Sequence, residues 1–133
     1  MKKSKKNYVE TVIEVPIHNL KWDIIFASEK CKELNVSEEM GTCCGITYKC
    51  DLKIYINTAL KKDLMIRTLR HELTHAYLWT YGLNQFTCWN EETICDFVET
   101  YASEITEHAN HLYEIYYADV NNLPVPDGAE ECE

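Results

Sequence analysis

A histidine–glutamate–histidine motif carries the clearest chemistry in the sequence. His71, Glu72 and His75 form the pattern H-E-x-x-H within a stretch of helical periodicity. In a helix, residues four apart lie about 40° apart around the axis, so both imidazoles project from one face and can reach a common ion. Glu72 lies about 100° from His71, where its carboxylate can hydrogen-bond a water held by the metal. The motif predicts a Zn²⁺ site with Glu72 as the general base.

A third ligand is needed, because two histidines supply half of a tetrahedral site and a catalytic zinc keeps its fourth position for water. The segment N-E-E-T-I-C-D, residues 90–96, offers the candidate carboxylates. Glu92 and Asp96 are four apart on one helix face, so Glu92 can bind the metal while Asp96 accepts the N–H of His71. Glu91 is the competing ligand, because the apolar stripe of this helix lies closer to it. We prefer Glu92, since a ligand helix has to offer the metal a polar face and an orienting partner.

These motifs resemble the gluzincin zinc peptidases, in which H-E-x-x-H is followed by E-x-x-x-D on the next helix. The runs H-E-L-T-H-A-Y-L-W-T-Y-G-L and N-E-E-x-x-C-D-F look like the ImmA/IrrE-type metallopeptidases of phages and integrative elements. The resemblance covers residues 53–103. Such relatives often carry the segment E-x-E-A-N-x-F-A. If Phe97 is aligned with the phenylalanine of that segment, Glu91 takes the position of its first glutamate. If Asp96 is aligned with its asparagine, Glu92 takes that position. The resemblance implies a zincin-like fold, a cytoplasmic location and, in some relatives, cleavage of repressors.

The resemblance also implies where the substrate and the oxyanion would bind. In zincins the strand before the active-site helix borders the cleft and pairs with an extended substrate. By this resemblance the edge formed by residues 52–56 would bind the peptide, and Tyr55 would line the cleft. Zincins commonly stabilise the oxyanion with a histidine or a tyrosine. The candidates are Tyr101, His108, His111 and Tyr113, and spacing does not choose among them. For each of them, packing or a surface position is the simpler interpretation.

Two other functions fit the same residues. A zinc-stabilised, non-catalytic binding module of phage or mobile-element origin would use the same ligands, with its fourth metal position closed. A metal-free helical protein would leave His71 and His75 solvated. Glu72 favours the peptidase, because a purely structural zinc site has no use for that carboxylate. We therefore predict a zinc-dependent endopeptidase that acts on a protein or peptide substrate.

The composition excludes several classes of partner. The 133 residues carry 13 Lys and Arg against 22 Asp and Glu, a formal net charge of −9. Such a surface repels phosphate backbones, so we expect no nucleic-acid partner, and no apolar run approaches the roughly 18–20 residues of a membrane span. The seven cysteines include no C-x-x-C pair, and the basic first residues precede no apolar segment. These features indicate reduced thiols and a cytoplasmic protein without a cleaved signal.

The elements around the motif predict an α+β fold, with a small antiparallel or mixed sheet packed on an active-site helix and a C-terminal helix. We expect residues 1–123 to form a single zincin-like metallopeptidase domain and residues 124–133 to form an acidic flexible tail. In the active-site helix, His71 continues an apolar stripe that includes Leu64. The expected elements are a strand over 8–17 that reaches an edge at Pro16, a helix over 18–35, a hairpin of 46–48 and 52–56, a helix from Asn57 or Thr58 to Tyr81 stopped by Gly82, and a helix over 91–120 with a break near 108–110.

Overall fold

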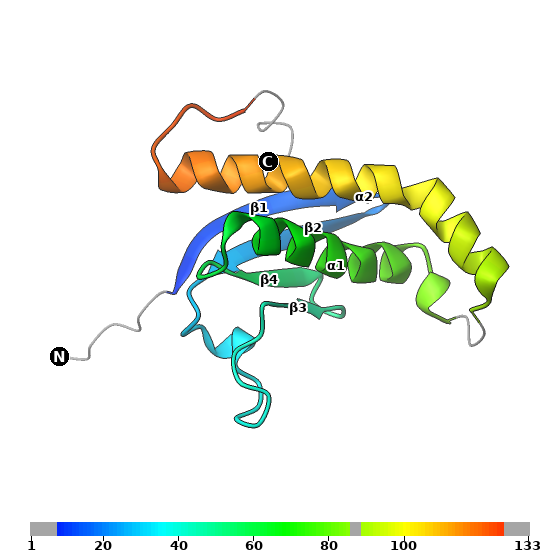
Figure 1. The fold of residues 1–133 in the computed structure, drawn as a ribbon, viewed down its shortest axis with the longest axis horizontal. Coiled ribbons are helices and arrows are strands. Elements are labelled where there is room, and N and C mark those ends of the chain that lie inside the picture. The colour runs from blue at the N-terminus through cyan, green and yellow to red at the C-terminus, as the bar shows by residue number, and fades with distance from the viewer. Residues whose placement is uncertain (1–7, 86–88, 127–133) are drawn as a thin grey trace.

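A computed structural model describes residues 8–85 and 89–126, and these residues form a four-stranded mixed sheet with two α-helices on one of its faces (Figure 1). The strand order is β1-β2-β4-β3, in which β2 and β4 are parallel and the other neighbours are antiparallel. The predicted α+β class with a mixed sheet and two helices is confirmed. The elements are β1 (Val9–Ile17), β2 (Leu20–Ala27), the 3-10 helix η1 (Lys32–Leu34), β3 (Gly45–Tyr48), β4 (Lys53–Asn57), α1 (Lys62–Thr80), the 3-10 helix η2 (Leu83–Gln85) and α2 (Glu91–Val120).

The main hydrophobic core fills the space between the sheet and the two helices. α1 lies over β3 and β4, α2 lies over β1, and the two helices also contact each other (Figure 1). Removing a large apolar side chain from water stabilises a fold by about 1.5–3 kcal/mol, so this layer fixes α1 firmly on the sheet. The largest fully buried side chains of this core include Trp22, Phe26, Ile54, Ile56, Met65, Leu69, Leu73 and Tyr77.

The segment 18–35 contains a strand and a short 3-10 helix, so the helix predicted there is wrong. In β2, Trp22 and Ile24 face the two helices, while Ile25 and Ala27 belong to a smaller cluster on the other face of the sheet. A strand that is buried on both faces has a nearly continuous apolar sequence. Within such a run, apolar residues also recur at three- and four-residue steps, which produced the false helical pattern.

β1 and the β3–β4 hairpin follow the sequence prediction, whereas the predicted substrate edge does not. β1 is an edge strand, as Pro16 indicates, and His18 turns the chain into β2 with a left-handed φ of 54° instead of starting a helix. β4 pairs with β2 on one side and with β3 on the other. The prediction of an edge at residues 52–56 is therefore wrong, and the open edge next to α1 belongs to β3.

α1 begins at Lys62, later than the predicted start at Asn57 or Thr58. Asn57 ends β4, and its Oδ1 accepts a 2.9 Å hydrogen bond from the backbone N–H of Ala59. This local bond holds the chain in a turn and delays the helix, a known effect of Asn side chains. Gly82 follows the helix with a φ of 73°, which confirms the predicted stop.

α2 begins with a capping box, in which Asn90 accepts from the Thr93 N–H and the Thr93 hydroxyl accepts from the Asn90 N–H. The helix continues to Val120 without the break that the sequence suggested near residues 108–110. Of the predicted tail, residues 127–133 lie outside the described residues. None of the helices within 8–85 and 89–126 has the length and apolar character to cross a membrane.

Candidate active site

Glu72 lies between α1 and the edge strand β3. It is only 7% exposed, and its Oε1 accepts a 2.6 Å hydrogen bond from the hydroxyl of Thr47 in β3. Gly45 allows this close packing, because a Cβ there would lie 2.7 Å from Thr68 Cγ2 and 3.1 Å from Glu72 Cγ. The carboxylate is thus fixed directly beneath the open edge of the sheet.

His71 and His75 lie beside Glu72 along one flank of α1. Their ring centroids are 5.1 Å apart, and the ring planes are inclined at 75°. His71 is exposed and His75 is partly buried. Leu64, which the sequence places with His71 on the apolar stripe of this helix, is itself 42% exposed, whereas Met65, Leu69 and Leu73 of that stripe are buried in the core. The two imidazoles therefore share an accessible flank, where one ion can contact both.

The surroundings of His75 favour its neutral form. Burial lowers the pKa of His75, and the nearby Glu72 carboxylate opposes this effect, whereas His71 and Lys49 lower the pKa further. Neutral imidazole is the form that binds a metal ion, because a protonated ring nitrogen has no lone pair to donate. The site thus holds His75 in the protonation state that a metal ligand requires.

A cavity of about 230 Å³ opens beside Glu72, between the start of β3 and the first turns of α1. It is smaller than the concavity of about 650 Å³ between Lys62 and Tyr113 on the α2 side, but that larger space has no histidine or cysteine in its lining. We assign the chemistry to the smaller cavity because it contains two of the three motif residues. Its lining consists of Cys44, Gly45, Leu64, Arg67, Thr68, His71 and Glu72.

The candidates for the third ligand do not join the histidines. Glu91, Glu92 and Asp96 are exposed on the first two turns of α2. Within residues 8–85 and 89–126, no three side chains of His, Cys, Asp or Glu converge in a group that could hold a metal. The structure therefore places His71 beside His75 and lines one cavity with His71 and Glu72, while the third ligand, Glu92 or Glu91, stays a prediction.

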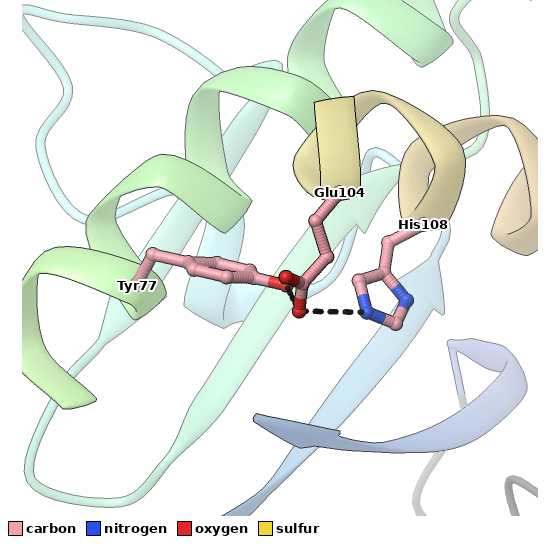
Figure 2. Close-up of polar contacts among 3 residues, drawn as sticks. All are labelled: Tyr77, Glu104 and His108. Atoms are coloured by element: carbon pink, nitrogen blue, oxygen red, sulfur yellow. Dashed lines mark hydrogen bonds and ion pairs between the residues drawn. The ribbon is translucent and has the colours of Figure 1, made fainter. Parts of the chain in front are cut away.

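Tyr101 and His108 lie around Tyr77, on a different flank of α1 from the motif. Tyr77 is two residues after His75, which places it about 160° away around the helix. Its hydroxyl donates a 2.7 Å hydrogen bond to Glu104 Oε2, and His108 Nε2 lies 4.0 Å from the same oxygen (Figure 2). The ring of Tyr101 packs against Tyr77 with centroids 5.7 Å apart. These oxyanion candidates therefore hold α2 against α1.

The other oxyanion candidates also have partners away from the motif. His111 Nδ1 lies 4.0 Å from Glu114 Oε1, one turn along α2. The ring of Tyr113 lies 5.5 Å from the Lys62 ammonium, at the first turn of α1. Neither side chain is brought to His71 and His75 by a contact among the described residues.

Tyr55 lies on the face of the sheet that the helices do not cover. It is 9% exposed and belongs to the smaller cluster with Cys31 and Leu34. Its ring meets that of Tyr48 edge-on, with centroids 5.7 Å apart. Successive side chains in a strand point to opposite faces, so Tyr55 points away from α1. The predicted role of Tyr55 in lining the cleft is wrong for this reason.

Sequence reasoning missed Thr47, Gly45 and Arg67. Thr47 is paired with Ile54, whose side chain faces α1, so strand alternation in the predicted hairpin contained the signal for its position. Arg67 is four residues before His71, which places both on one helix face. The close approach at Gly45 has no such signal, because it depends on how α1 crosses the sheet.

Comparisons of the chain with protein-family models, with characterised proteins and with solved structures found no match. Two imidazoles beside a carboxylate that is hydrogen-bonded in place can bind a divalent ion and accept a proton from a water next to it.

Proposed function

We propose that this protein is a zinc-dependent endopeptidase in which Glu72 is the general base. The observation that carries the proposal is the position of the Glu72 carboxylate, which is buried beneath the edge strand, held by Thr47 and flanked by His71 and His75. An extended peptide can add to an open strand edge through backbone hydrogen bonds. A peptide on β3 would therefore pass directly over the groups that cut it.

The donors at this site fit zinc in kind. His71 and His75 would be two ligands, and Glu92 would be the third, with Glu91 as the alternative. Bound zinc would lower the pKa of a coordinated water to about 7, so that the water can give up a proton near neutral pH. Asp96 would accept the N–H of His71 and hold its ring in place.

The chain's own residues would position the substrate and move the proton. Glu72 Oε1 accepts the hydrogen bond from Thr47, so Oε2 is the oxygen available to a water. Glu72 would take the proton from the attacking water and pass it to the leaving nitrogen of the peptide. Thr47 fixes the carboxylate in one orientation, which reduces the reorganisation needed in the transition state.

A zincin-like fold and a place in the gluzincin family are part of the same proposal. A mixed sheet whose antiparallel edge strand lies against the H-E-x-x-H helix supports a zincin-like architecture. With the motif resemblance, it supports a minimal gluzincin related to the ImmA/IrrE type, acting in the cytoplasm of a cell that carries a phage or mobile element. The corrected substrate edge is β3, because β4 is paired on both sides.

The test is cleavage of a proteome-derived peptide library by zinc-loaded protein. We expect Glu72→Gln to retain zinc but to lose activity by a factor on the order of 10²–10⁴, because the amide cannot accept the proton. Glu104→Gln is the matched control, since this carboxyl contacts Tyr77 on the other flank and should not affect cleavage. Equal activity of wild type and Glu72→Gln would overturn the proposal. Zinc binding without any cleavage would favour a zinc-stabilised binding module instead.

A further inference from the structure

Arg67 lies in the cavity beside the proposed catalytic glutamate. It is one helical turn before His71, its residue is exposed, and it lines the cavity together with His71 and Glu72. Among the described residues, its guanidinium takes part in no ion pair or side-chain hydrogen bond. Five donors in a planar fork are therefore available to a ligand that enters this cavity.

The charges around the cavity favour an anionic ligand. Glu72 is the acidic residue of the lining, and its Oε1 is already occupied by the Thr47 hydroxyl. In a chain with a formal net charge of −9, the lining of this cavity contains an exposed arginine that forms no ion pair within the described residues. Such a guanidinium attracts a negatively charged substrate group.

We propose that Arg67 binds a carboxylate of the substrate next to the scissile bond, and thereby selects where the chain is cut. The inference rests on the proposed peptidase function and adds the substrate class. Arginine binds carboxylates through two parallel hydrogen bonds, which gives both affinity and orientation. The cavity of about 230 Å³ is below the roughly 300–1,000 Å³ of small-molecule pockets, so it suits one side chain or chain end.

Two substrate groups share this chemistry. One is the side chain of Asp or Glu beside the cut, and the other is the C-terminal carboxylate of a peptide. A side chain would produce internal cuts at a fixed distance from an acidic residue. A C-terminal carboxylate would produce cuts at a fixed distance from the peptide end, and C-terminal amidation would abolish them.

The experiment is to map the cleavage sites of zinc-loaded protein in a peptide library with free and with amidated C-termini. Four proteins are compared: wild type, Glu72→Gln, Arg67→Glu and Arg70→Glu. Arg70 is the matched control, because it is an exposed arginine on α1 that does not line the cavity. Zinc content and thermal unfolding of each variant show that the fold and the metal site are retained.

We expect wild type to cut peptides with the carboxylate faster than matched amide peptides, by on the order of tenfold in kcat/KM. Arg67→Glu should remove or invert this preference, while Arg70→Glu should keep it. Cleavage without a carboxylate preference, or a preference that survives Arg67→Glu, would overturn the role of Arg67 and leave the peptidase intact. If wild type cuts nothing that Glu72→Gln does not cut, the proposed function is wrong and this inference is wrong with it.

Discussion

Histidines and glutamates lie along two flanks of α1 in different physical settings. On the β3 flank, His71 and His75 are accessible, and Glu72 is held by a strand hydroxyl beneath an open edge. On the α2 flank, Glu104 and His108 meet the hydroxyl side of Tyr77, whose ring is fully buried (Figure 2). Histidines and carboxylates on the second flank join two helices, whereas those on the first flank border solvent and a cavity.

This difference shows why residue type alone does not identify a site. His108 and His75 both have a pKa that burial lowers, and both lie near a glutamate. The partner of His108 is an acid that is already bonded to Tyr77, so the group is satisfied within the protein. His75 instead has a second imidazole 5.1 Å away and an accessible cavity nearby.

The largest expected effect is on zinc content, when a histidine on the β3 flank is removed and the result is compared with removal of a histidine on the α2 flank. His75→Ala should lower zinc content to near zero and abolish cleavage, because half of the predicted histidine ligation is lost. His108→Ala should keep full zinc content, since its ring lies on the α2 flank. Metal analysis of both purified variants checks this, and zinc loss in His108→Ala alone would reverse the assignment of the flanks.

A smaller effect is expected from closing the space between β3 and α1. Gly45→Ala would put a Cβ 2.7 Å from Thr68 Cγ2. The side chain of Thr68 is branched and buried, so the strand or the helix has to shift. We expect a loss of about 1–3 kcal/mol in the free energy of unfolding, as for other overpacked sites. Denaturant titration measures it, and cleavage should fall more than stability predicts because Glu72 moves. Unchanged stability would show that the close approach is relaxed.

On the α2 flank, we expect a purely structural effect of similar or lesser size. Tyr77→Phe keeps the buried ring but removes the hydrogen bond to Glu104, which should cost about 1 kcal/mol of unfolding free energy. Zinc content and cleavage should be unchanged. A loss of activity at full stability and full zinc content would mean that Tyr77 takes part in the chemistry.

The smallest expected effect is a pH dependence of stability from His108. Burial lowers the pKa of His108, and His111 adds to this, while Glu104 and Glu107 oppose it. The unfolded chain therefore binds more protons below the ordinary pKa of about 6.5, so stability falls as the pH is lowered through that range. In zinc-free protein, His108→Asn should flatten this slope, which denaturant titration across the pH range would measure. An unchanged slope in His108→Asn would contradict the shift.

Much of the architecture could be predicted from the sequence, because periodicity records which face of an element is buried. The α1 and α2 segments, the β3–β4 hairpin and the edge position of Pro16 were recognisable in this way. The segment of β2 was not, since a strand buried on both faces loses its alternation and resembles a helix. β4 is also central, but Lys53 and Tyr55 alternate there with Ile54 and Ile56, which kept its strand pattern recognisable.

The site was predictable only where it lies within one helix. The spacing of His71, Glu72 and His75 determines their relative positions, and the structure agrees. Tyr55 was misplaced, because alternation puts it opposite Ile54 and Ile56 but does not record which face of the sheet α1 covers. The substrate edge was misplaced because no local pattern records strand order. The third ligand depends in the same way on how the first turns of α2 meet α1, so Glu91 and Glu92 remain alternatives.

The central claim is that the β3 flank of α1 is a zinc site built on two histidines. X-ray absorption at the zinc edge, measured on stoichiometrically loaded protein, tests it most directly because it separates nitrogen from sulfur ligands. We predict about one zinc per chain, bound by two imidazoles with oxygen donors completing the sphere and no sulfur. Zinc bound through thiolates of exposed cysteines such as Cys44 or Cys50, or no zinc at all under replete conditions, would contradict the account.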